Sequence, residues 1–237
     1  MKKRIWELDA LRGLCVLGMV VVHAVFDMVK LYKLVSWEYP RWLSFVQNWG
    51  GVLFLLISGI CVTLGRHHIR RGLIVLGAGM LCSAVTYGMY RYGFADRGMV
   101  IYFGVLHCLG VCMILWALFK KLPWWILIPM GVVLVMLGLD IRNMPTLPHP
   151  WLTPFGLVMH NFKTSDYFPL LPYFGFFLFG AALGKLLYKN KQSLLPKVNE
   201  KILPIRFLTV CGKCSLWIYL LHQPVLSLVF GLIVQQQ

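Results

Sequence analysis

Five ionisable side chains recur along the first long apolar stretch of the sequence: Asp9, Arg12, His23, Asp27 and Lys30. At about 100° per helical residue they fall within an arc of about 60°, so they share one stripe of the helix. At about 1.5 Å per residue, Arg12 and His23 are about 16 Å apart along the axis, and Asp27 lies about 6 Å farther out. Because charges inside a membrane are costly, the stripe predicts a functional path across it.

His23 and Asp27 are one helical turn apart, and this spacing suits acid–base chemistry. A neutral imidazole tuned by a carboxylate is the usual base near neutral pH, and an imidazole can also carry an acyl group. The alternative is structural: Asp9 and Arg12 would form an interfacial pair, and His23 and Asp27 a satisfied hydrogen bond. The residues alone leave both interpretations open.

Two further histidines lie inside apolar runs, His107 and His222. We place His107 about 10 Å in from the outer face, level with His23, and His222 nearer the midplane. His107 is therefore a candidate helper of His23 across a cavity. Each of the two can equally be a hydrogen-bonded core residue.

Composition indicates which elements carry these residues. The chain has 237 residues, of which 59% are hydrophobic and only 13% charged, with a mean hydropathy of +0.73. We expect an all-α integral membrane protein, a single domain over residues 1–237, with about seven transmembrane helices around a central polar cavity. The predicted spans are 8–32, 45–64, 73–90, 100–119, 123–139, 168–187 and 208–234, the last bent or broken near Pro224.

The formal charge of +15 is distributed over alternate short loops, which is the positive-inside pattern of membrane proteins and makes nucleic acid an unlikely partner. The N-terminus is then cytoplasmic and the C-terminus external, in the cytoplasmic membrane. The longest outer loop, 140–167, is rich in proline and suits a cap over a cavity. The cytoplasmic basic residues are Lys2, Lys3, Arg4, Arg66, Arg70, Arg71, Lys120, Lys121, Lys185, Lys189, Lys191, Lys197, Lys201 and Arg206.

Seven cysteines lie in or beside the apolar runs and predict no disulfide framework. Cys211 and Cys214 form a CxxC, but a zinc site needs two more soft ligands and none stands nearby. We therefore expect no metal.

Four motifs together resemble a known family. They are Glu7-Leu-Asp-Ala-Leu-Arg-Gly-Leu with His23 after it, Tyr102-Phe-Gly-Val-Leu-His-Cys-Leu-Gly-Val, Asp166-Tyr-Phe-Pro-Leu-Leu-Pro-Tyr-Phe-Gly, and Ser215-Leu-Trp-Ile-Tyr-Leu-Leu-His-Gln-Pro-Val-Leu. From about Trp6 to Leu226 the chain resembles the bacterial branch of the heparan-α-glucosaminide N-acetyltransferase catalytic domain family, whose opening motif is shared with broader acyltransferase families.

The resemblance implies transfer of an acetyl or acyl group from cytosolic acyl-CoA to an amino sugar or glycan at the outer face. Asp9 and Arg12 match the family's helix-start motif, and His23 occupies a polar position of the family. From the geometry of the stripe we expect His23, Asp27 and His107 to be catalytic, and we expect substrate contacts from Asp9, Arg12, His222 and Asp166. In the animal enzymes the position of His23 looks like Asn, and a proposed catalytic His follows it. Because residues 31–42 hold no histidine here, either His23 has taken over that role or the acceptor chemistry differs.

The phosphates of CoA require cations at the cytoplasmic mouth, for which Arg66, Arg70, Arg71 and Lys213 are candidates. Orientation and contact with anionic lipid would explain the same residues. The resemblance also favours a homodimer. The rival function is a secondary transporter of a small polar solute, but no inverted repeat is visible. The acceptor and the acyl chain length stay open.

Overall fold

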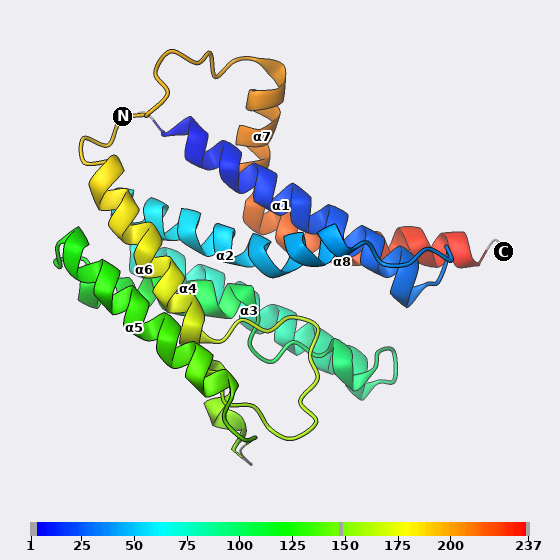
Figure 1. Ribbon diagram of the computed structural model, residues 1–237. Helices are drawn as coiled ribbons and strands as arrows, with labels where there is room; N and C mark the ends of the chain where they lie inside the picture. Colours follow the sequence, from blue (N-terminus) through cyan, green and yellow to red (C-terminus); the bar gives the residue numbers. More distant parts are fainter. Residues whose placement is uncertain (1–3, 147–148, 236–237) are drawn as a thin grey trace. The chain divides into compact units, whose positions relative to one another are not determined.

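The computed structural model describes residues 4–146 and 149–235, apart from the side chain of Asn48. Lys2 and Lys3, which were assigned to the cytoplasmic side above, lie outside these residues, as does Pro148 of the proline-rich loop 140–167. The elements are α1 (Trp6–Phe26), η1 (Asp27–Leu31), α2 (Arg41–Leu64), α3 (His68–Arg91), η2 (Arg97–Met99), α4 (Val105–Phe119), α5 (Trp124–Arg142), η3 (Pro150–Phe155), α6 (Leu170–Leu187), α7 (Leu203–Lys213) and α8 (Ser215–Val234) (Figure 1).

Six of these helical segments are long and apolar enough to cross a membrane, which confirms the predicted all-α membrane fold. They are α1 continued through η1, α2, α3, α5, α6 and α8. The prediction of seven spans is close, and the difference lies in α4. This helix is apolar but only 15 residues long, about 22 Å, because it begins at Val105 and not at Val100.

The chain divides into two compact units, which are described separately below. The first combines the N-terminal part up to Phe54 with the C-terminal part from Lys191, and the second runs from Leu55 to Asn190. The single domain expected over the whole chain stays a prediction.

In the first unit, α1 packs against α7 and then against α8. α1 and α7 cross at two glycines, where a Cβ on Gly13 would meet the backbone of Leu208 and one on Gly212 would meet the backbone of Asp9. Small residues let membrane helices approach this closely. Glu7, which is 6% exposed, connects the N-terminal end of α1 to the loop that precedes α7. It accepts hydrogen bonds from Ser193 Oγ (2.9 Å) and Leu194 N (2.8 Å).

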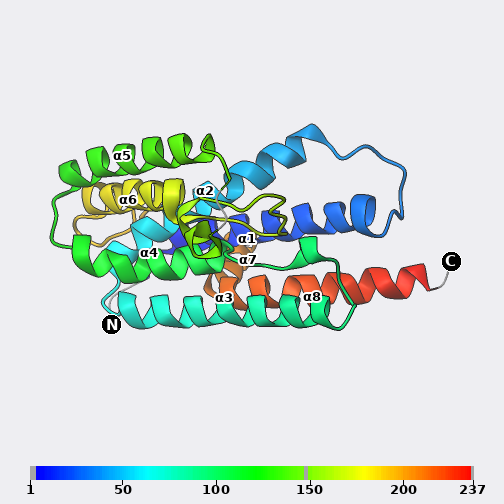
Figure 2. The ribbon, with the colours of Figure 1, turned by 90° about the horizontal axis from the view of Figure 1, so that it is seen from below.

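The second unit contains two close helix pairs, α3 with α4 and α5 with α6. Figures 1 and 2 show α5 and α6 side by side from two directions. Glycines again occupy the contacts: Gly72 faces the Gly110 backbone, and Gly131 faces Gly175. Close packing at small residues therefore stabilises the helix pairs within each unit.

The last predicted span differs from the structure in one respect. We expected a helix over 208–234 with its break near Pro224, but the break lies at Cys214, between α7 and α8. α8 continues through Pro224 as one helix. The preceding α7 has an apolar face and a polar face, whereas α8 is apolar over most of its length apart from polar residues such as His222 and Gln223.

Candidate active site

The charged stripe predicted on the first helix is largely present. Asp9 and Asp27 are buried, with 3% and 2% of their surface exposed, and Arg12 and His23 are half-buried. Lys30 departs from the stripe and is exposed. The reason is that residues 27–31 form a π-helical turn, whose wider spiral rotates each residue less than the 100° assumed for an α-helix.

At its N-terminal end, which is the predicted inner end, the stripe is an ion-pair network. Asp9 Oδ1 accepts a hydrogen bond from Arg12 Nη2 at 2.5 Å, and Asp9 Oδ2 lies 3.1 Å from Arg4 Nε. Two guanidinium groups thus offset the cost of burying the Asp9 carboxylate. Arg12 Nε is buried and has no hydrogen-bond partner among the described residues.

At its C-terminal end, which is the predicted outer end, the stripe meets α8 and forms what we call the α1–α8 polar cluster: His23, Asp27, His222 and Gln223. Gln223 Nε2 donates a hydrogen bond of 2.8 Å to Asp27 Oδ2. The rings of His23 and His222 are 5.0 Å apart between centroids, with 60° between their planes. The structure therefore brings two predicted residues of α1 and η1 together with His222.

Gln223 was not among the predicted site residues. It stands directly after His222 in the last of the four motifs. The predicted site residues stand out by the high free-energy cost of burying an ionisable side chain in a membrane helix, and an uncharged amide does not carry that cost. The sequence predicts that Asp27 pairs with His23. Among the described residues, the Asp27 side chain instead accepts its hydrogen bond from Gln223.

Two acceptor atoms of this cluster are unsatisfied. His222 Nδ1 lies 2.6 Å from the Tyr219 carbonyl oxygen, and because a carbonyl only accepts, Nδ1 carries the proton and donates. In the neutral ring Nε2 is then a bare lone pair. Both His222 Nε2 and Gln223 Oε1 are buried without a hydrogen-bond partner in the described part of the chain.

His107 lies in the second unit, and both of its ring nitrogens have local partners. Nδ1 accepts a hydrogen bond of 3.2 Å from the backbone N–H of Gly104, the residue before the first turn of α4. Nε2 is then the protonated nitrogen and lies 3.2 Å from Ser83 Oγ, which in turn donates to the Ile101 carbonyl at 2.7 Å. These contacts explain its burial structurally, and its catalytic role stays a prediction.

Asp166, a predicted substrate contact, lies at the same helix start. Its Oδ2 accepts a hydrogen bond of 3.0 Å from Val105 N, the first residue of α4. A carboxylate here satisfies a free backbone N–H and favours the positive end of the helix dipole. The position of Asp166 is thus accounted for by capping.

The predicted donor-binding residues are all exposed, as a phosphate site at a membrane surface requires. Arg66, Arg70 and Arg71 belong to the second unit, between α2 and the first turn of α3, whereas Lys213 ends α7 in the first unit. The three arginines form a local group, and the role of Lys213 beside them stays a prediction.

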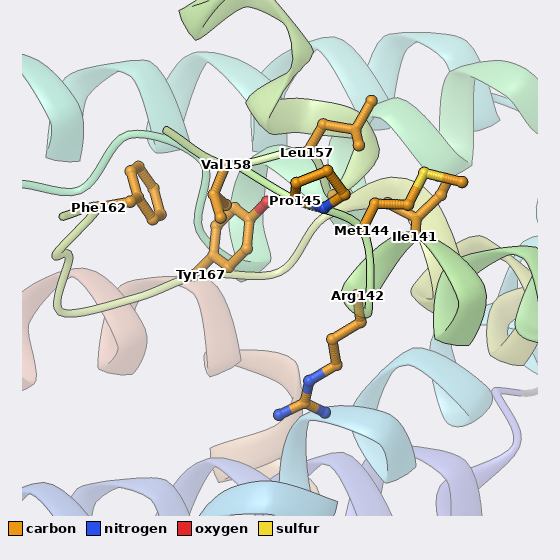
Figure 3. A pocket seen from close by; sticks show the side chains of 9 residues that line it. Ile141, Arg142, Met144, Pro145, Leu157, Val158, Phe162 and Tyr167 are labelled. Carbon is orange, nitrogen blue, oxygen red and sulfur yellow. The ribbon is translucent and has the colours of Figure 1, made fainter. Parts of the chain in front are cut away.

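The end of α5 and the predicted outer loop that follows it line a cavity of about 240 Å³ in the second unit. Its lining is apolar apart from Arg142 and Tyr167, and Figure 3 shows Arg142 extending away from Tyr167, Val158 and Pro145. The Tyr167 hydroxyl donates to the Thr153 carbonyl at 2.8 Å, and burial raises the pKa of Tyr167, so this donor stays protonated. The bond shapes the loop.

All seven cysteines are free, and the described residues contain no group of three or more His, Cys, Asp or Glu side chains arranged to hold a metal ion. No curated protein and no solved structure gives a significant match to the chain. A sequence profile does match: residues 4–224, which include α1 to α7 and the α1–α8 polar cluster up to Pro224, match the family described as heparan-alpha-glucosaminide N-acetyltransferase, catalytic. The chain is a membrane protein that belongs to this family of acetyltransferases.

Proposed function

We propose that the protein transfers an acetyl or other acyl group from cytosolic acyl-CoA to an amino sugar or glycan at the outer face of the cytoplasmic membrane. The family supports an acetyltransferase-type enzyme, and the α1–α8 polar cluster carries the finer proposal. It sets a 2% exposed carboxylate and two imidazole rings between helices apolar enough to span a membrane. Such groups are retained in membrane helices where function needs them.

His23 is the central catalytic residue of this proposal. It acts on the acceptor as a general base, or it attacks the thioester and carries the acyl group. Asp27, one turn farther along, orients the site, and Gln223 holds the Asp27 carboxylate in place at 2.8 Å. His222 contacts the acceptor, and His107 and Asp166 remain proposed as a catalytic residue and a substrate-binding residue.

The donor binds at the inner end of the stripe. Arg12 is anchored there by Asp9, so its guanidinium is held in one position while Nε remains unpartnered among the described residues. Arg66, Arg70, Arg71 and Lys213 contact the phosphates of CoA from the exposed surface. No metal takes part, the N-terminus is cytoplasmic, and the protein functions as a homodimer.

Acetyl-CoA binding tests this proposal against the transporter alternative. A ligand of the native state stabilises by about 2.7 kcal/mol at 100 times its Kd, so acetyl-CoA should raise the Tm of detergent-solubilised protein by several degrees. CoA without an acyl group and an unrelated nucleotide serve as controls. A transporter of an unrelated solute would show no shift with acetyl-CoA, and that result would contradict the proposal.

A further inference from the structure

Two unsatisfied atoms lie on consecutive residues of α8, His222 Nε2 and Gln223 Oε1, and both are hydrogen-bond acceptors. The neighbouring groups determine which atom of each side chain carries hydrogen and which is the acceptor. The Tyr219 carbonyl fixes the proton of His222 on Nδ1, and the Asp27 carboxylate fixes the Gln223 amide nitrogen toward η1. Each residue is thus held on one side and presents an acceptor with no partner among the described residues.

A buried acceptor without a partner costs about 1–3 kcal/mol, and folded proteins rarely leave one unexplained. His107 shows the contrast within the same chain, since both its nitrogens have protein partners. The side chains of His222 and Gln223 instead complement a group that brings hydrogen-bond donors. An amine or a hydroxyl fits this requirement. A carboxylate or phosphate would instead place its own lone pairs against those of His222 Nε2 and Gln223 Oε1.

We infer that His222 Nε2 and Gln223 Oε1 bind the N–H or O–H groups of the acceptor, and that His222 is the base that removes the acceptor's proton. This rests on the proposed acyl transfer. The 5.0 Å contact between the His222 and His23 rings places the base beside the residue proposed for the acyl group. The substrate class is a sugar that bears hydroxyl groups or neutral amino groups.

The same proton transfer applies whether the acyl group comes directly from acyl-CoA or from acylated His23. The acceptor's N–H or O–H bond breaks and its proton moves to His222 Nε2, while the acceptor atom forms a bond to the acyl carbon. The bond from that carbon to its leaving group breaks, either the thioester sulfur of CoA or a His23 nitrogen. The leaving group takes the proton from His222, which restores the neutral ring.

His222→Asn and His222→Gln test this inference in purified protein in lipid nanodiscs, with acetyl-CoA as donor and D-glucosamine or D-glucose as acceptor. Asn can keep the bond to the Tyr219 carbonyl but lacks Nε2, and Gln places an amide near Nε2 that cannot accept a proton. Product is measured by mass spectrometry. We expect kcat to fall by about 10² to 10⁴ in both variants, with the KM for acetyl-CoA within about threefold of wild type.

The matched control is His160→Asn, at an exposed loop position, which should leave kcat unchanged. Wild-type protein that acetylates neither sugar would contradict the proposed function itself. An active wild type with both His222 variants within about threefold in kcat would overturn the base assignment alone. Loss of the folded state in both variants, seen by gel filtration and Tm, would make His222 structural and would also overturn it.

Discussion

Asp9 and Asp27, the two buried carboxylates of the charged stripe, are held by different kinds of partner. Asp9 lies between two guanidinium groups, whereas Asp27 accepts from a neutral amide. The inner end of the stripe is therefore an anchored ion pair, suited to fix an arginine in place. The predicted outer end, the α1–α8 polar cluster, combines a carboxylate, an amide and two imidazole rings, with no Lys or Arg among its four residues, so it is suited to proton transfer.

This difference predicts separate roles for Arg12 and His23. Arg12→Ala removes the anchored guanidinium and should weaken acetyl-CoA binding by about tenfold or more, as expected for loss of a charged hydrogen bond of about 1.5–3 kcal/mol. His23→Ala should leave donor binding largely intact. The measurement is the acetyl-CoA dependence of Tm in each variant, and equal loss in both would refute the division.

His23 itself is predicted to be essential for turnover. Removing a general base costs a factor of about 10² to 10⁴ in rate, and removing an acyl carrier abolishes turnover. His23→Ala and His23→Asn should therefore lose acyl transfer while keeping their fold and donor affinity. Near wild-type rates in both would reject this role for His23 and leave His222 as the remaining imidazole of the α1–α8 polar cluster, and collapse of the fold in both would show that His23 is structural.

The sequence predicts Asp9, Arg12, His23 and Asp27 as one functional face because each is ionisable in an apolar helix, a cost that function must justify. It does not predict Gln223, whose burial is less costly. Nor does it predict the displacement of Lys30, since the π-helical turn that causes it depends on backbone hydrogen bonding and not on residue type.

At the scale of elements, the crossing of α1 and α7 positions the inner end of the stripe. A Cβ on Gly212 would fall on the Asp9 carbonyl, so a side chain there must separate the helices. Gly212→Val should lower stability by about 1–3 kcal/mol or more, the usual cost of overpacking, and should disturb the Asp9–Arg12 pair. The Tm of the detergent-solubilised variant measures this loss.

Gly18→Ala is the control on the same helix. A Cβ at Gly18 meets nothing within 4 Å, and alanine is about 1 kcal/mol better than glycine in a helix interior. This variant should be neutral or slightly stabilised. Equal effects of the two substitutions would mean that the close crossing contributes nothing to stability.

Hydropathy predicts most spans to within a few residues, because apolar length is what the membrane requires. It fails in two places, each for a local reason. Residues 100–104 are apolar but extended, and the helix starts where Asp166 caps Val105. Apolar residues also continue through Cys214, so hydropathy gives no sign of the backbone break that separates α7 from α8.

At the scale of the whole molecule, the basic loops set the expected orientation. One contact within the second unit agrees with the assignment of Lys120 and Lys185 to the same side. Lys185 Nζ, near the end of α6, donates to the carbonyl oxygens of Lys120 and Leu122, after the end of α4. These lysines were assigned to the same cytoplasmic face. Alternation of the spans then places the loop after α6 inside and the loop after α5 outside.

Cysteine labelling in intact cells tests this orientation. Gln192→Cys lies in the loop after α6 and His160→Cys in the loop after α5, and both positions are exposed. A membrane-impermeant maleimide should label the second and not the first, measured as the increase over the parent protein, which carries the exposed Cys214. After the membrane is permeabilised, both should react. Labelling of position 192 from outside would invert the topology, and an acyl-CoA donor could then no longer reach Arg12 from the cytosol.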